Sequence, residues 1–217
     1  MVWGRGGCGI VGGVATEEKI REHIERTLDV DVRSGYGSEA QVLERLREQV
    51  RDEFRKAPPA EREAEVERWA ELARRQLAAQ RELEESWTEP TANDRLDAAF
   101  AALRHHGIVA LQDAGYTMSD GWEDVHAARD RVPRAWGGVF FHRQDVERAV
   151  EGGGLMLAFG AFVGGDDHDP ESLRLARQIC EVLAVHDIAT EWNGSLKQRI
   201  RVPSFEWRKR RWTSAPK

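Results

Sequence analysis

The feature that most constrains the fold is a change of hydrophobic period near residue 93. Between residues 16 and 88 the apolar residues recur every three or four positions, a spacing that is typical of amphipathic helices. After residue 93 they gather in short unbroken runs, such as 108–112 and 155–162, with helical stretches between them. Short apolar runs bounded by polar turns are typical of buried strands. We therefore expect a helical region followed by an α/β domain.

Residues 16–88 predict about three helices. Thr16, followed by two acidic residues, is expected to cap the first helix. Ser38 and Gln41 have the spacing of a capping box for the second helix, whose apolar stripe is Val42, Leu46, Val50 and Phe54. The third helix is expected from about residue 60 to residue 87, with an inner face made of Val66, Trp69, Leu72, Leu83 and Trp87. These helices could also supply a contact between copies in a homo-oligomer.

The region after residue 93 predicts alternating helices and strands. Asn93 or Asp94 is expected to cap the first helix, and Asp169 the longest one. Strands are expected at 108–112, 138–142, 155–162, 188–192 and 199–203, and the last two form a hairpin because Asn193 and Gly194 stand between them. This order predicts an α+β fold, a ferredoxin-like (split βαβ) sandwich with an extra helix and a C-terminal hairpin strand. A doubly wound α/β sheet is the alternative.

The same patterns predict the domain limits. We expect a flexible glycine-rich leader at 1–15, a helical region at 16–88, the α/β domain at 93–212 and a tail at 213–217. Gly7 to Gly12 match the letters of the dinucleotide-binding fingerprint, but no strand precedes them and the following helix leads into another helix. We therefore expect no cofactor there.

Charge and hydropathy exclude several classes of protein. The 38 acidic residues outnumber the 32 basic ones and give a net charge of −6, which argues against nucleic acid as a partner. Only residues 205–212 group four cations with aromatic residues, and a solvated C-terminus is the favoured explanation over a nucleic-acid contact. No apolar run approaches the ~18 residues of a membrane span, and no signal peptide is recognisable, so a cytoplasmic protein is expected.

Polar side chains accumulate in two connections that follow predicted strands, at 113–122 and 142–145. The predicted sheet places both connections on one side, where they could form a small cleft for a polar ligand or a peptide end. The candidate ligand-binding residues are Asp113, Tyr116, Ser119, Asp120, Trp122, His142, Gln144 and Asp145. The competing interpretation is structural: Ser119 or Asp120 and then Asp145 cap helices, and His142 bonds to backbone.

Other chemistry finds less support in the sequence. Asp166, Asp167, His168 and Asp169 are suitable metal-ligand types, but adjacent side chains point in different directions, so we expect no metal site. Cys180 is expected to point inward, and no serine lies in a Gly-x-Ser-x-Gly turn, so no catalytic residue is assigned.

The sequence contains six recognisable segments, at 97–103, 107–110, 140–150, 152–160, 190–194 and 199–202. Together they resemble an uncharacterised bacterial family, a domain of unknown function, over residues 94–212, and the N-terminal helices resemble it more loosely. Many relatives carry a segment similar to Cys-Cys-Gln-x-Cys-Gly after the first strand, whereas residues 113–121 here contain no thiol. The order of elements is also similar to that of the ribonuclease E regulator B family, which implies a protein-binding inhibitor.

We therefore expect a non-enzymatic binding or regulatory protein whose ligand is an unknown protein or a small polar molecule. The alternatives are a small hydrolase or transferase that uses His142 with Asp113, Asp120 or Asp145, and a nucleic-acid contact through the basic C-terminal segment.

Overall fold

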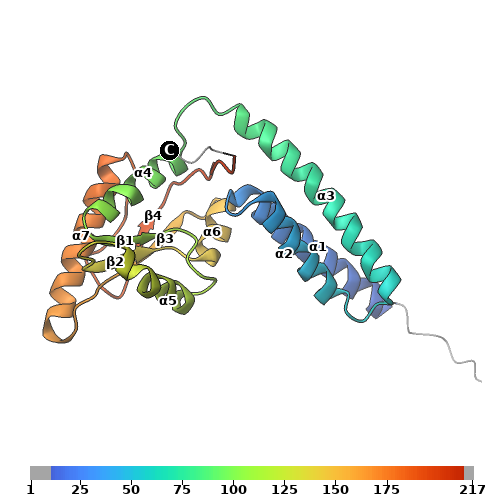
Figure 1. Ribbon diagram of the computed structural model, residues 1–217, viewed down its shortest axis with the longest axis horizontal. Coiled ribbons are helices and arrows are strands. Elements are labelled where there is room, and N and C mark those ends of the chain that lie inside the picture. The colour runs from blue at the N-terminus through green and yellow to red at the C-terminus, as the bar shows by residue number, and fades with distance from the viewer. Residues whose placement is uncertain (1–10, 213–217) are drawn as a thin grey trace, which may run out of the picture. The chain divides into compact units, whose positions relative to one another are not determined.

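The computed structural model describes residues 11–212, and the side chains from residue 17 onward (Figure 1). The chain forms two compact units. The helical unit contains the residues up to Val32 together with 37–83, and the α/β unit contains 33–36 and the residues from Glu84 onward. The dinucleotide-like letters up to residue 10, the thiol of Cys8 and the tail at 213–217 lie outside the described residues.

The helical unit is built from α1 (Val11–Ser34), α2 (Glu39–Glu53) and α3 (Pro59–Glu85). The predicted start of the first helix is wrong, because α1 begins before Thr16. Threonine can stand inside a helix as well as at its cap, so its presence does not fix the boundary. The capping box of α2 is confirmed, since Ser38 Oγ accepts from Gln41 N and Gln41 Oε1 accepts from Ser38 N.

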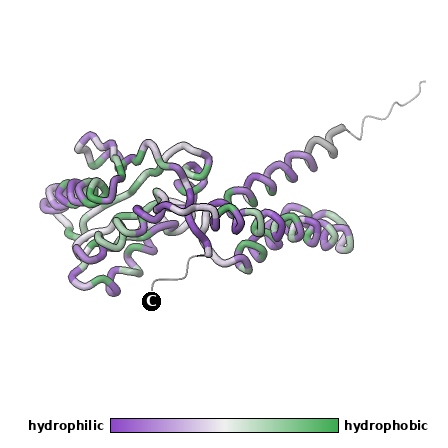
Figure 2. The backbone as a smooth tube through the Cα atoms, turned by 90° about the horizontal axis from the view of Figure 1, so that it is seen from above, coloured by the Kyte–Doolittle hydropathy of each residue, from purple (hydrophilic) through white to green (hydrophobic). Residues whose placement is uncertain are grey.

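Each helix of this unit buries apolar residues spaced three or four positions apart, while hydrophilic residues fill the positions between them (Figure 2). The residues that follow this spacing are Ile24, Leu28, Val42, Leu46, Val50, Phe54, Val66, Trp69, Ala73 and Leu77, and Val30, Val32 and Ala70 are buried beside them. Arg21 ties α1 to α3 through both carboxylate oxygens of Glu65, at 3.0 and 2.8 Å. The prediction that Leu83 lies on the inner face is wrong, because its side chain is 53% exposed.

The α/β unit contains a four-stranded mixed sheet in the order β1-β2-β3-β4. β1 and β2 are parallel, and the other neighbouring pairs are antiparallel. The strands are β1 (Ile108–Leu111), β2 (Gly137–Phe140), β3 (Leu155–Ala161) and β4 (Ile200–Val202). The helices are α4 (Ala92–His105), α5 (Met118–Ala128), α6 (Arg143–Val150) and α7 (His168–Val185), with short 3-10 turns at Arg129–Arg131 and Gly165–Asp167. The predicted α+β class with an N-terminal helical part is confirmed.

The sheet differs in detail from a split βαβ sandwich, in which another strand separates the two parallel strands. Here β1 and β2 pair directly, and helices cover both faces of the sheet (Figure 1). Two adjacent glycines show why both faces can be covered closely. A Cβ at Gly137 would lie 2.7 Å from Leu175 of α7, and one at Gly138 would lie 2.5 Å from Val125 of α5. Successive strand residues point to opposite faces, so β2 lies between two helices.

The predicted C-terminal hairpin is reduced to a single bridge. Glu191 and Arg201 exchange backbone hydrogen bonds of 2.8 and 3.0 Å, but residues 188–192 form no strand. β4 pairs with β3 instead. The chain therefore turns near Asn193 and Gly194, but the segments on either side of the turn do not pair as two strands.

Helix starts in this unit also differ from the predicted caps. Thr91, not Asn93 or Asp94, caps α4, and Asp94 completes its capping box. α7 begins at His168, before the expected cap at Asp169. In both places several capping residue types stand close together, so the sequence leaves more than one possible start.

Residues 205–212 pack against the α/β unit, so the prediction of a solvated C-terminus is wrong for them. Trp207 Nε1 donates to Ser34 O at 3.1 Å, and its ring lies 6.0 Å from Tyr36 and 6.3 Å from Phe141. Phe205 is buried beside it, at 5.7 Å between ring centroids. Apolar burial of these aromatic rings offsets the cost of ordering the segment.

Candidate functional site

The connections that follow β1 and β2 lie side by side. The backbone N–H of Ala114 donates to Phe141 O at 3.0 Å, and the N–H of Arg143 donates to Gly115 O at 3.0 Å. The guanidinium of Arg143 lies 3.6 Å from the carboxylate of Asp113. The two strands are parallel, so their carboxyl ends reach the same edge of the sheet. The structure thus brings together the loops that carry most of the predicted site residues.

The first loop turns sharply through two residues with positive φ, Asp113 at 52° and Gly115 at 59°. A Cβ at Gly115 would lie 2.3 Å from Cβ of Asp120. Only glycine fits there without moving the start of α5. The turn therefore fixes where Tyr116 leaves the loop.

Asp120 has the capping role that the structural interpretation assigns to this region. Its Oδ2 accepts from the backbone N–H of Thr117 at 2.9 Å and of Tyr116 at 3.2 Å. These bonds, with that of Thr117 the largest cause, lower the pKa of Asp120. Thr117 is the N-cap residue itself, so the prediction of Ser119 as the cap is wrong.

His142 and Asp145 form a buried pair at the start of α6. Their exposed fractions are 5% and 2%, and His142 Nδ1 lies 3.2 Å from Asp145 Oδ2. His142 occupies the N-cap position, and its backbone N–H points to the same carboxylate oxygen at 3.4 Å. Asp145 therefore caps the helix and lies against the imidazole, but His142 Nδ1 makes no hydrogen bond among the described residues.

Two arginines surround this carboxylate. Arg199 Nη1 lies 3.0 and 2.8 Å from the two oxygens of Asp145, and Arg148 Nη2 lies 3.0 Å from Oδ1. The side chain of Arg199 is 30% exposed and its Nη1 is 3.5 Å from His142 Nε2. Arg199, which sequence reasoning did not assign to the site, thus contacts both members of the buried pair and is itself partly exposed.

The environment of His142 favours the neutral imidazole. Burial is the largest cause that lowers its pKa, and the positive charges of Arg199 and Arg148 act in the same direction. The negative charge of Asp145 opposes them without reversing the net shift.

The remaining predicted residues fall into two groups. Tyr116, Ser119 and Gln144 are exposed near the meeting point of the two loops, and the ring of Tyr116 is 55% exposed. Trp122 is not part of this group. Its ring packs edge-on against that of Phe140, with 5.1 Å between ring centroids.

The cations of the C-terminal segment have partners within the α/β unit. Lys209 Nζ lies 2.9 Å from Asp97, and Arg210 Nη1 lies 2.7 Å from Asp94. Arg211 Nη1 donates to the carbonyl of Tyr36 at 2.6 Å. These pairs reduce the positive charge that a phosphate backbone would meet.

The structure also describes the acidic run at 166–169 and Cys180, which the sequence offered as possible metal-binding and nucleophilic groups. Within residues 11–212, no three His, Cys, Asp or Glu side chains gather as a metal ion would require, and the run at 166–169 is exposed. Cys180 is half-buried on α7, and burial raises the pKa of its thiol. A raised pKa reduces the thiolate fraction on which nucleophilic attack depends.

The fold and the loop geometry define an α+β domain with a helical N-terminal region and polar loops at one edge of its sheet. The chain belongs to the family described as a domain of unknown function (DUF6891), whose model matches residues 17–211. The match therefore includes the N-terminal helices, where the sequence resemblance is looser, as well as the α/β unit. No curated protein and no solved structure matches the chain.

Among the helices that the structure describes, none combines the length and the apolar character needed to span a bilayer.

Proposed function

We propose that this protein binds a small polar ligand, without transforming it, at the loops that follow β1 and β2. The observation that carries the proposal is the hydrogen bond from Arg143 N to Gly115 O. It holds the backbones of the two loops together one residue before Tyr116 and one residue before Gln144. Both of these side chains are exposed. An aromatic ring, an amide and a hydroxyl from Ser119 are groups that recognise a small polar molecule.

The Asp113–Arg143 ion pair supports the same proposal. It lies at the junction of the loops, and both side chains are largely buried, with exposed fractions of 19% and 17%. A partly buried ion pair fixes the loops in one arrangement, which lowers the entropy cost of ligand binding.

The buried pair below the loops argues for binding over catalysis. A general base must reach the proton that it removes, either directly or through one water molecule. His142 is buried, and Arg199 approaches its Nε2. The positive charge of that arginine opposes proton uptake by the imidazole. We therefore assign His142 and Asp145 to support of the loops.

Mass spectrometry of small molecules that remain on the natively purified full-length protein tests the proposal. We expect a compound that is enriched on the wild type and lost from the double variant Tyr116→Ala, Gln144→Ala. Val185→Ala is the matched control, because Val185 is 80% exposed at the end of α7. It should retain the compound. Identical profiles for all three proteins, or no enriched compound on any, would contradict the proposal.

One observation favours a second candidate, a hydrolase or transferase. The contact of 3.2 Å between His142 Nδ1 and Asp145 resembles the way in which a carboxylate orients a catalytic imidazole. Hydrolysis of a simple activated ester such as p-nitrophenyl acetate distinguishes the two. A rate that is well above background and is abolished by His142→Asn, with the fold retained, would favour the enzyme.

A further inference from the structure

A hollow lies at the edge of the sheet opposite to the loops that follow β1 and β2. β3 is antiparallel to β2, and Ala161 at its end pairs with Gly137 at the beginning of β2. The residues after β3 therefore lie where β1 and β2 begin. α5 follows β1 and runs back toward this edge (Figure 1). A cavity of about 470 Å³ lies there, within the range of small-molecule sites.

Aromatic rings form one wall of this cavity. The imidazole of His126 lies 6.0 Å from the ring of Trp122, tilted by 34°, and 5.7 Å from the ring of Phe162, tilted by 39°. The imidazole thus lies between two larger rings that come from α5 and from the end of β3. A flat aromatic ligand can stack on such a surface.

Packing of Trp122 against the sheet fixes the position of this aromatic wall. Trp122 packs edge-on against buried Phe140, and its ring covers Gly160 so closely that a Cβ there would lie 2.9 Å from it. The absence of a side chain at Gly160 leaves the space that the indole occupies. A wall fixed in this way is largely formed before a ligand arrives.

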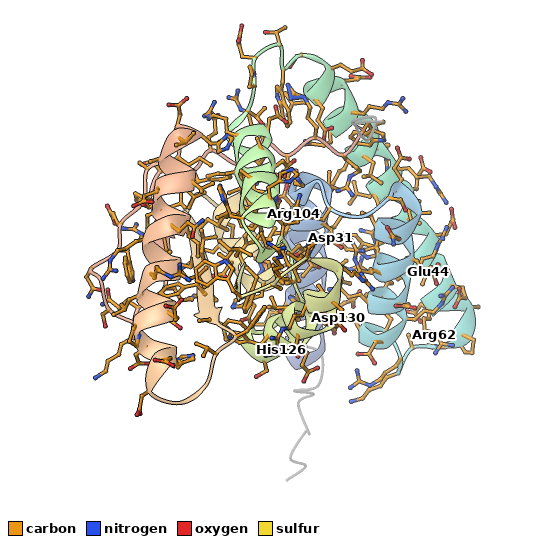
Figure 3. All side chains as sticks on the ribbon, turned by 60° about the vertical axis from the view of Figure 1, so that its left-hand side comes forward. Asp31, Glu44, Arg62, Arg104, His126 and Asp130 are labelled. Atoms are coloured by element: carbon orange, nitrogen blue, oxygen red, sulfur yellow. The ribbon has the colours of Figure 1, made fainter. Side chains whose placement is uncertain are left out.

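The charge of the cavity favours an anion. Arg129 lines it, with its guanidinium 4.8 Å from the ring centroid of Phe162. His126 and His168 also line it, and Nδ1 of His168 is 3.1 Å from Asp169. Among the described residues that line the cavity, none is acidic. The end of α5 that bears these side chains can be found in Figure 3, where His126 on the helix and Asp130, the residue after Arg129, are labelled.

A cation at the C-terminal end of α5 also stabilises the helix dipole, and this role alone would account for the presence of Arg129 there. That role does not require a row of neighbouring aromatic rings or a hollow beside the helix end. The ring contacts, the cavity and the cation together form a more specific arrangement.

We propose that this cavity binds a small planar aromatic carboxylate. Its ring stacks on the wall formed by Trp122, His126 and Phe162, and its carboxylate accepts hydrogen bonds from Arg129. A guanidinium can donate two parallel hydrogen bonds to a carboxylate, which makes this contact both strong and directional.

Ligand-observed NMR titration of the full-length protein tests the charge requirement. The probes are indole-3-carboxylate and its neutral counterpart indole-3-carboxamide. We expect the acid to bind about tenfold more tightly than the amide, a difference typical of one charge-assisted contact. Arg129→Gln should remove this difference. Arg131→Gln, an equally exposed change two residues away, should leave it intact.

The stacking requirement is tested with His126→Ala against His105→Ala, since both imidazoles are exposed and only the first lines the cavity. We expect His126→Ala to weaken binding of the acid by about fivefold, as expected for loss of one ring contact. Circular dichroism should show the same fold for every variant. Equal affinity for acid and amide, insensitivity to Arg129→Gln and His126→Ala, or no binding to the wild type at ~10 mM probe would each overturn the proposal.

Discussion

The guanidinium of Arg199 contacts both carboxylate oxygens of Asp145, although 54 positions separate the two residues in the chain. The contact joins the residue before β4 to the first turn of α6. Because Asp145 also caps α6 and contacts His142, one buried carboxylate links a helix start, an imidazole and the edge strand of the sheet. Loss of the negative charge of Asp145 should therefore strongly reduce the stability of the α/β unit.

Asp145→Asn should destabilise the α/β unit by about 3 kcal/mol. The amide keeps an oxygen for the helix cap, but it leaves Arg199 and Arg148 without their shared negative charge, and breaking a largely buried ion pair is costly. Urea-induced unfolding followed by circular dichroism measures the change. Asp124→Asn is the control, because Asp124 is exposed on α5 and should shift stability by less than about 0.5 kcal/mol. Equal midpoints for the two variants would contradict this account.

Stability should fall as the pH is lowered through the ordinary pKa of histidine, 6.5. The folded state lowers the pKa of His142, first through burial and then through Arg199 and Arg148, while Asp145 opposes the shift. Below pH 6.5 His142 therefore binds a proton more readily in the unfolded chain than in the folded protein, and folding becomes less favourable. Well above pH 6.5 the imidazole is neutral in both the folded and the unfolded state, so its contribution to stability no longer changes with pH.

Comparison of unfolding free energies at about pH 7.5 and pH 5.5 measures this effect. His142→Asn is the reference, because asparagine is a good N-cap residue and does not titrate. The decrease in stability should be smaller in this variant than in the wild type. The same decrease in both proteins would assign the pH dependence to other groups.

Local patterns in the sequence predicted much of the helical unit and the meeting of the two loops. The capping box at Ser38 and the stripe from Val42 to Phe54 depend on neighbours within one or two helical turns, so they can be recognised without the fold. The shared edge of the two loops followed from the expected βαβ unit, because its two strands are parallel and end at the same edge of the sheet. That these strands are also direct neighbours was not predicted.

Features set by distant residues were not predictable in this way. Arg199 joins the site only because β4 pairs with β3, and nothing near it in sequence indicates Asp145 as its partner. The split βαβ expectation failed for a similar reason, because the direct pairing of β1 with β2 joins residues that are far apart in the chain. The close approach of α7 and α5 to β2 likewise depends on Gly137 and Gly138 having no side chain.

Glycine at these helix contacts should be essential for packing. Gly121→Ala should destabilise the α/β unit by about 3 kcal/mol, because its Cβ would lie 2.1 Å from the buried ring of Phe140. Gly138→Ala should have a similar effect through Val125. Gly164→Ala is the control, since no atom lies within 4 Å of its Cβ position. Thermal unfolding should show a clear decrease for the first two variants only, and wild-type behaviour of Gly121→Ala would contradict the packing of α5 on β2.

The C-terminal segment should stabilise the α/β unit through Trp207. Trp207→Ala removes ring contacts with Tyr36 and Phe141 and the hydrogen bond to Ser34 O, so we expect a loss of about 3 kcal/mol in urea unfolding. Arg208→Ala is the control, because its side chain is 48% exposed and pairs only with exposed Glu206 among the described residues. Its effect should stay within about 0.5 kcal/mol. If the segment instead served mainly to hold a polyanion, Arg208→Ala would weaken retention on heparin resin while Trp207→Ala left stability unchanged.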